Sequence, residues 1–99
     1  MKRGDILFPH SFTLAAAVSR LGNNVAVRDI ATFLDGRGPD RRSYHQILKH
    51  MRKHGHLDRV TDEGLDTKER VQWSLTESGK SILDDSADYY RFALHVFGE

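Results

Sequence analysis

The chain has 99 residues and a net charge of +1, and 38% of its residues are hydrophobic and 29% charged, a balance typical of a soluble folded protein. This length fits one domain and excludes a two-domain enzyme. No run approaches the roughly 18 apolar residues of a bilayer-spanning helix, and no signal-peptide core follows residues 1–5. Cysteine is absent, which excludes disulfides, thiolate zinc sites and thiol nucleophiles. We therefore expect a cytoplasmic protein that is stabilised by packing or by a partner chain.

Charge is unevenly distributed along the chain. Residues 36–59 carry seven basic and two acidic side chains, whereas residues 60–99 carry four basic and nine acidic ones. One short segment therefore holds most of the positive charge. A concentrated positive field favours a polyanionic partner such as nucleic acid.

Helical spacing of apolar residues predicts two helices in the first third of the chain. The first covers residues 9–22 and ends at Gly22, a residue typical of helix C-termini. A short β-prone stretch at residues 25–27 leads into a second helix over residues 28–34, which stops before Gly36.

A third helix is predicted over residues 40–54. Asp40 is a candidate N-cap because its carboxylate can accept the free backbone N–H groups of the first turn, and Gly55 supplies a C-terminal stop. Four large side chains recur at the spacing i, i+3, i+4, i+7 and define an inward stripe: Tyr44, Ile47, Leu48 and Met51. The opposite side is polar and basic.

The remainder predicts a β-hairpin and a last helix. Residues 57–61 and 70–75 alternate apolar with polar side chains, and the polar stretch between them is typical of a long turn. Thr76 is a candidate N-cap for a helix that continues to residue 97. The predicted fold class is therefore mainly α with a small β-hairpin (α+β), in one domain over residues 1–99.

Two segments resemble a known family. Residues 43–57, SYHQILKHMRKHGHL, are similar to the recognition helix of PadR-like and MarR-like winged helix-turn-helix transcription regulators. Residues 73–83, WSLTESGKSIL, resemble the strand-to-helix junction of the same families and are the more specific of the two. The resemblance covers roughly residues 25–83. It implies a helix-turn-helix and wing over residues 25–75 and a dimerisation helix over residues 76–97.

The outward side of the third helix supplies candidate DNA contacts. A helix in the major groove needs hydrogen-bonding side chains for base edges and basic ones for phosphates. Near the start of the helix, base contacts are expected from Arg42, Ser43, His45 and Gln46, and phosphate contacts are expected from Arg37, Arg41, Lys49 and Lys53. An ordinary solvated helix face is the alternative interpretation, because amphipathic helices usually carry one.

The predicted wing and the six histidines carry further basic or titratable side chains. Arg59, Lys68 and Arg70 are expected to touch the DNA backbone, although acidic residues outnumber basic ones at the wing tip. The alternatives are a wing that makes few DNA contacts and an acidic tip that faces a protein partner. His50 and His54 lie at i and i+4, but two histidines do not complete a zinc site. We therefore predict no metal and no other cofactor, and a mild pH dependence of DNA binding.

The last helix is longer than a wing-capping role requires. At about 22 residues it spans about 33 Å, and its apolar side is wide. We interpret the excess as a homodimer interface, with an intramolecular core as the alternative, and expect it to include Leu83, Ala87, Tyr90, Leu94 and Phe97.

No catalytic pattern is present, since the chain has neither a P-loop nor a nucleophile elbow, and we predict that it is not an enzyme.

The interpretation that fits best is a homodimeric, nucleoid-associated repressor that binds double-stranded DNA without a small-molecule effector. Two alternatives remain: a plasmid, viral or chromosome-partition protein that coats repeated sites, and a winged-helix protein adaptor.

Overall fold

The computed structural model describes residues 6–22, 24–61, 63–64 and 70–97. The first half of the chain contains α1 (Pro9–Leu21), β1 (Val25–Ala26) and α2 (Val27–Leu34). The second half contains the 3-10 turn η2 (Arg41–Ser43), α3 (Tyr44–Lys53), β2 (Leu57–Thr61), β3 (Val71–Leu75) and α4 (Glu77–Phe97). This is the element order of a winged helix-turn-helix, as the sequence predicts.

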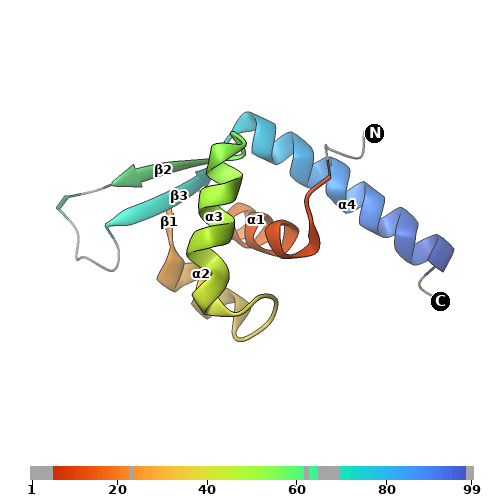
Figure 1. Ribbon diagram of the computed structural model, residues 1–99, viewed down its shortest axis with the longest axis horizontal. Helices are drawn as coiled ribbons and strands as arrows, with labels where there is room; N and C mark the ends of the chain where they lie inside the picture. The colour runs from red at the N-terminus through yellow and green to blue at the C-terminus, as the bar shows by residue number, and fades with distance from the viewer. Residues whose placement is uncertain (1–5, 23, 62, 65–69, 98–99) are drawn as a thin grey trace.

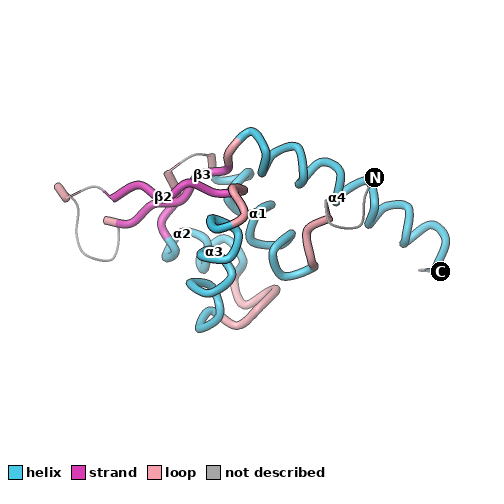
Figure 2. The backbone as a smooth tube through the Cα atoms, turned by 45° about the horizontal axis from the view of Figure 1, so that its top comes forward, coloured by secondary structure: helices cyan, strands magenta, loops and turns pink. Residues whose placement is uncertain are grey.

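The strands form a three-stranded antiparallel sheet in the order β1-β3-β2. β3 lies in the middle, with Trp73 opposite Val25 of β1 and opposite Arg59 of β2. The hairpin β2–β3 extends to one side of the molecule and α4 to the other, which gives an elongated shape of 48 × 27 × 21 Å (Figure 1). The tube view shows the helices α1, α2 and α3 gathered between these two projections (Figure 2).

The core lies where α1, α2 and α3 meet the base of the sheet. Each element contributes fully buried side chains, which include Leu14, Val18, Ile30, Leu48, Met51, Leu57 and Trp73. The hydrophobic effect stabilises this arrangement by about 1.5 to 3 kcal/mol for each large apolar side chain removed from water. α1, α2 and α3 are thereby held in fixed orientations around one core.

Local capping signals locate the helix starts. The Asp40 Oδ1 atom accepts a hydrogen bond from the backbone N–H of Arg42 at 2.9 Å. The Thr76 Oγ1 atom accepts one from the N–H of Gly79, also at 2.9 Å. Both N-cap predictions are confirmed.

The prediction of one continuous helix over residues 40–54 was wrong at its start. Residues Arg41–Ser43 form a 3-10 turn, and the α-helix begins at Tyr44. Ser43 N–H donates to the carbonyl of Asp40 at 2.8 Å, an i to i+3 bond of the kind common at helix N-termini. The first candidate base-contacting residues therefore precede α3.

The predicted alternation of β2 was also wrong beyond its first residue. Leu57 is buried, but the rest of the strand is exposed, and Val60 is 46% exposed. β2 is an edge strand whose outer part extends past the core, so neither face of that part is covered.

Among the described residues, no helix has the length and hydropathy required to cross a membrane.

The junction between the end of α3 and the start of α4 is very close. Thr76 N–H donates to the carbonyl of His56 at 3.1 Å, and Thr76 Oγ1 donates to the carbonyl of Gly55 at 2.7 Å. A Cβ atom added at Gly79 would lie only 2.1 Å from the His56 oxygen. Glycine at this position permits the contact.

We therefore expect Gly79→Ala to destabilise the fold. The added methyl group must push the His56 backbone away, at a cost of about 1 to 3 kcal/mol, as in other overpacked sites. Thermal unfolding measures this loss. Ser78→Ala, at an exposed position one residue earlier, is the control. Equal melting temperatures for the two variants would contradict the proposed contact.

Candidate nucleic-acid interface

α3 has one buried and one open face. Tyr44, Leu48 and Met51 are each no more than 2% exposed, and Ile47 is half-buried. The predicted helix phase is confirmed. Besides His50, seven polar or basic side chains of η2 and α3 are exposed: Arg41, Arg42, His45, Gln46, Lys49, Arg52 and Lys53. Together these seven residues form what we call the α3 basic face. Ser43, also a candidate base contact, is half-buried.

An ion pair marks the start of this face. The guanidinium of Arg42 lies 3.0 Å from the Asp40 carboxylate. This side chain, together with the Arg42 backbone N–H, lowers the pKa of Asp40 below its usual value. The Arg42 side chain is 91% exposed and its partner 54%, so water screens the pair. If Arg42 contacts a base or a phosphate, it therefore gives up only a weak, solvent-screened ion pair with Asp40.

Arg37 has an intramolecular role that the sequence did not reveal. Its Nε atom donates to the carbonyl of Leu34 at 2.8 Å, and its Nη2 atom donates to the carbonyl of Phe33 at 2.9 Å. Both carbonyls belong to the last turn of α2, where a positive charge is favourable, and the Leu34 carbonyl also accepts the backbone N–H of Arg37 at 3.0 Å. The side chain expected to contact phosphate thus also caps the helix that precedes the turn.

The wing offers less positive charge than the sequence suggested. Arg59 is exposed on β2, whereas Arg70 is half-buried with its Nε atom 3.7 Å from the Glu63 carboxylate. Lys68, the third expected contact, lies outside the described residues. Glu63 therefore neutralises part of the wing's own positive charge.

Three histidines meet at the C-terminal end of α3. The ring centroids of His50 and His54 are 4.4 Å apart, and those of His54 and His56 are 6.1 Å apart. Desolvation by burial lowers the pKa of His56. The positive charges of the nearby His54 and His50 lower it further. We call these three residues the histidine cluster. Within the described part of the chain, no group of three His, Asp or Glu side chains is arranged to hold a metal ion.

The lowered pKa of His56 predicts a pH-dependent stability. The unfolded chain binds a proton at this residue more readily than the folded chain does, so stability falls as pH drops below about 6.5. Wild type and His56→Gln should be compared by urea unfolding at several pH values between about 5 and 8. The wild type should lose more stability on acidification than the variant, and parallel profiles would contradict the prediction.

The apolar side of α4 divides into two parts. Near the core, Leu83 and Ala87 are half-buried, and Tyr90 donates a hydrogen bond from its hydroxyl to the carbonyl of Leu7. The Tyr90 ring also packs edge-to-face on Phe12 at 5.0 Å. Farther along, the large side chains are open, with Phe92 61% and Leu94 67% exposed.

The predicted interface residues thus have different surroundings. Leu83 packs against the core, and Tyr90 is engaged with the N-terminal segment of its own chain, while Leu94 has no such cover. The side chain of Phe97 lies outside the described residues. The first half of α4 packs within its own chain, whereas the second half keeps four exposed apolar side chains. Tyr89, Phe92 and Val96 lie on one side of the helix, and Leu94 lies on the opposite side. We call these four residues the α4 apolar end.

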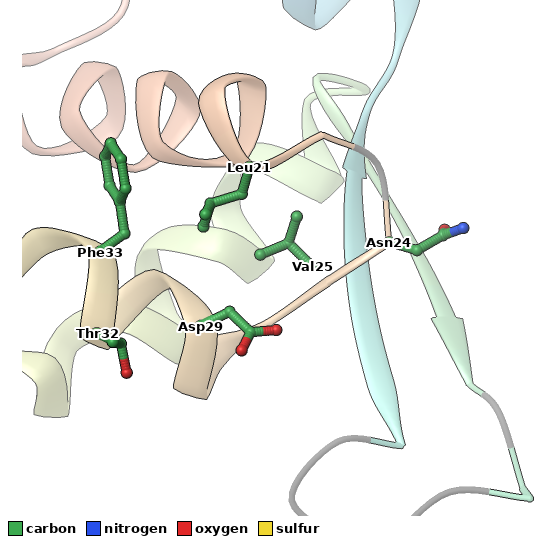
Figure 3. Close-up of a pocket in the computed structure, with 6 residues that line it drawn as sticks. All are labelled: Leu21, Asn24, Val25, Asp29, Thr32 and Phe33. Atoms are coloured by element: carbon green, nitrogen blue, oxygen red, sulfur yellow. The ribbon is translucent and has the colours of Figure 1, made fainter.

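A separate pocket of about 290 Å³ lies between the end of α1, β1 and α2. Figure 3 shows Leu21 of α1 and Phe33 of α2 on its walls, with Asp29 and Thr32 contributing polar atoms. Among the described residues that line it, Asp29 supplies a carboxylate and none supplies a cation. This composition does not suit a phosphate, so the pocket is not part of the candidate DNA contact.

No protein-family model and no curated protein matches the chain. Solved structures do. A PadR family transcription regulator from Clostridium difficile R20291 superposes with a TM-score of 0.77 at 16% identity, covering 92% of this chain and 96% of that one. The chain has the fold of winged-helix regulators.

Two further structures have the same fold. BpsR from Bordetella bronchiseptica, whose DNA binding is regulated by 6-hydroxynicotinic acid, has a TM-score of 0.75 at 12% identity and covers 97% of this chain and 67% of that one. CouR from Rhodococcus jostii RHA1, solved with p-coumaroyl-CoA, has a TM-score of 0.70 at 16% identity, with 92% and 60% coverage. The chain therefore spans about three fifths of the length of CouR.

Proposed function

We propose that the protein is a sequence-specific, double-stranded DNA-binding transcription regulator. The observation that supports this proposal most strongly is the α3 basic face, which is exposed along the whole helix. Tyr44, Leu48 and Met51 pack the opposite side of the helix against the core. Duplex DNA presents one phosphate charge about every 1.7 Å, and its major groove admits an α-helix. Of the three structures reported above, one is a transcription regulator and another is regulated in its DNA binding, which supports the same role here.

Residues at different places on and around the α3 basic face are proposed to contact different parts of the DNA. η2 and the first turn of α3 enter the groove first and carry the residues proposed to read bases, Arg42, Ser43, His45 and Gln46. Basic residues along the flanks are proposed to bind phosphates: Arg37, Arg41, Lys49, Lys53, Arg59, Lys68 and Arg70. Because Arg70 is paired with Glu63, we expect the wing to contribute less than α3.

We further propose a homodimer that pairs through the second half of α4. The α4 apolar end is exposed on two sides of the helix, and aromatic residues are enriched where protein chains associate. A two-fold axis would place two recognition helices about 34 Å apart, so half-site centres about 10 bp apart are expected. Occlusion of a promoter by this dimer would make it a repressor associated with the nucleoid.

Substitutions on α3 test the DNA contact. Arg42→Ala should cost about 1 to 3 kcal/mol on the preferred site and relax its specificity, because a base contact is lost. Lys49→Ala should weaken binding to all sequences alike and reduce the salt slope by about one. Fluorescence anisotropy with specific and scrambled duplexes measures both. Asp29→Ala, on the exposed side of α2, is the control, and losses equal to that control for both variants would reject the α3 face.

A substitution in the α4 apolar end tests the dimer. Leu94→Glu should shift the protein from dimer to monomer, because it places a charge in an apolar interface. Since Leu94 is 67% exposed within one chain, the monomer should remain folded by circular dichroism. Ser81→Glu introduces the same carboxylate at an exposed position near the start of α4. Sedimentation that is identical for wild type and Leu94→Glu would contradict the interface.

A protein adaptor is the second candidate function, favoured by the Glu63–Arg70 pair on an otherwise acidic wing. Salt separates the two candidates. A DNA binder that touches six or more phosphates should lose about a thousandfold in affinity between about 50 and 200 mM salt. A chain that binds DNA weakly and without this dependence fits the adaptor instead.

The prediction that no effector exists has no support from the related folds. BpsR and CouR are associated with small organic ligands, 6-hydroxynicotinic acid and p-coumaroyl-CoA. We accordingly do not include the absence of an effector in the proposed function.

A further inference from the structure

A groove of about 390 Å³ lies between α1 and the end of α2. Four residues of α1 form one wall at the spacing i, i+3, i+4, i+7: Thr13, Ala16, Ala17 and Arg20. The facing wall comes from the end of α2, which includes Phe33, and from the turn that follows it. We call this hollow the α1–α2 groove.

The floor of the groove is apolar. Ala17 is buried and Ala16 is half-buried, and neither side chain extends beyond its Cβ atom, so another helix can approach α1 closely. Phe33 lines the groove beside them and stays 38% exposed. A cavity of about 150 Å³ holds benzene, so the groove has room for about two side chains of the size of leucine or phenylalanine.

The end of the groove at Thr13 is closed by a tight contact. A Cβ atom added at Gly38 would lie 2.8 Å from the Thr13 Cγ2 atom, so the turn after α2 packs directly on α1. The φ angle of Gly38 is +80°, a value that favours glycine. The Thr13 hydroxyl donates to the carbonyl of Pro9 at 2.8 Å, which fixes the side chain. The fold therefore shapes the groove before a partner binds, which lowers the ordering cost of binding.

A cation stands at each end of the groove. Arg37 precedes Gly38, and its guanidinium is held by two carbonyls of the last turn of α2. Arg20 lies two helical turns from Thr13, about 10 Å along α1. It is exposed and has no ion-pair partner in the part of the chain that the structure describes. No carboxylate lines the groove among the described residues. This charge pattern fits two acidic groups about two turns apart.

An acidic amphipathic helix has the shape and the charge that this groove requires. Such helices bind apolar grooves through side chains at i, i+3, i+4 and i+7. Apolar residues at i+3 and i+4 would lie over Ala16 and Ala17, and carboxylates at i and i+7 would reach the two arginines. Duplex DNA supplies negative charge but no apolar helix face, so it does not suit the floor.

α4 of a second copy does not offer this pattern. The carboxylates within α4 are Glu77, Asp84, Asp85 and Asp88. Only the first two are seven positions apart, and the residues at i+3 and i+4 between them are Lys80 and Ser81, which are polar. The α4 apolar end therefore lacks the paired acidic groups that the groove favours. The complementary occupant is a different protein.

We propose that the α1–α2 groove binds an acidic amphipathic helix of another protein. Two carboxylates of this helix pair with Arg20 and Arg37, and the apolar side chains between them contact Phe33 and the alanines of α1. Because a guanidinium binds a carboxylate through two parallel hydrogen bonds, the arginines set the register of the helix. Burial of the apolar side chains supplies affinity.

A designed peptide tests the groove. The probe is an alanine-based helix of about 18 residues, blocked at both ends, with glutamates at i and i+7, leucine at i+3 and phenylalanine at i+4. Anisotropy of the labelled peptide with the whole 99-residue chain should show saturable binding, and backbone NMR shifts should map to α1 and the end of α2. Replacement of both glutamates by glutamine should raise the Kd about fivefold. Equal affinities, or shifts confined to α3 or α4, would overturn the proposal.

A charge exchange identifies the residue that the peptide meets. Arg20→Glu should raise the Kd of the glutamate peptide by about tenfold, and a peptide with one glutamate changed to lysine should bind this variant better than it binds wild type. Arg20 is exposed, so the variant should keep its melting temperature. Arg28→Glu, at an exposed position of α2 that does not line the groove, is the control and should leave the Kd unchanged. Equal losses in the two variants would contradict the site.

Sedimentation of the protein without peptide tests a second copy as the occupant. A copy bound in the groove would be repelled or released when the charge at Arg20 is reversed. The proposal predicts identical sedimentation for wild type and Arg20→Glu. A shift of Arg20→Glu to a smaller species would overturn the proposal in favour of a contact between copies.

Arg37 connects the groove to DNA binding, because it is also among the residues proposed to bind phosphate. This consequence rests on the proposed function. A saturating amount of the peptide should remove one phosphate contact and reduce the salt slope of DNA binding by about one. An unchanged slope would contradict the shared role of Arg37, and complete loss of DNA binding would contradict a groove separate from the α3 basic face. The peptide titration involves no DNA, so failure of the groove and failure of the proposed function are distinguishable.

Discussion

The packing of one face of α3 into the core is the constraint on which the rest of the structure depends. Tyr44, Leu48 and Met51 are buried against the other helices and the base of the sheet, and this fixes the rotation of the helix about its axis. A helix that commits one stripe to the core must expose the opposite stripe. In this chain the exposed stripe carries the densest positive charge, so core formation and display of the basic face are the same event.

Both ends of α3 are tied to other elements by specific contacts. At its start, Asp40 caps η2 and pairs with Arg42. At its end, Thr76 bridges the turn after α3 to the first turn of α4, and the approach is so close that only glycine fits at position 79. The orientation of α3 is therefore coupled to that of α4. Dimerisation through the second half of α4 would then fix the spacing between two such helices.

Local signals in the sequence were sufficient for much of this fold. The caps at Asp40 and Thr76 and the inward stripe of α3 depend on neighbouring residues, so spacing alone predicted them. The contact between Tyr90 and Leu7 joins residues 83 positions apart, and no local pattern signals it. The capping role of Arg37 and the grouping of three histidines around one pocket likewise arise only when separate elements meet. The fold was therefore more predictable than the assignment of individual site residues, of which Tyr90 and Arg37 proved to have intramolecular partners.

Selection of bound fragments from random duplex DNA at about 150 mM salt tests the central claim most directly, because it reports specificity, symmetry and spacing together. The account predicts enrichment of an inverted repeat with half-site centres about 10 bp apart, and loss of that enrichment when Arg42 and Gln46 are both replaced by alanine. Fragments recovered without any common sequence, or the same enriched repeat from the doubly substituted protein, would contradict the claim that the α3 basic face reads DNA.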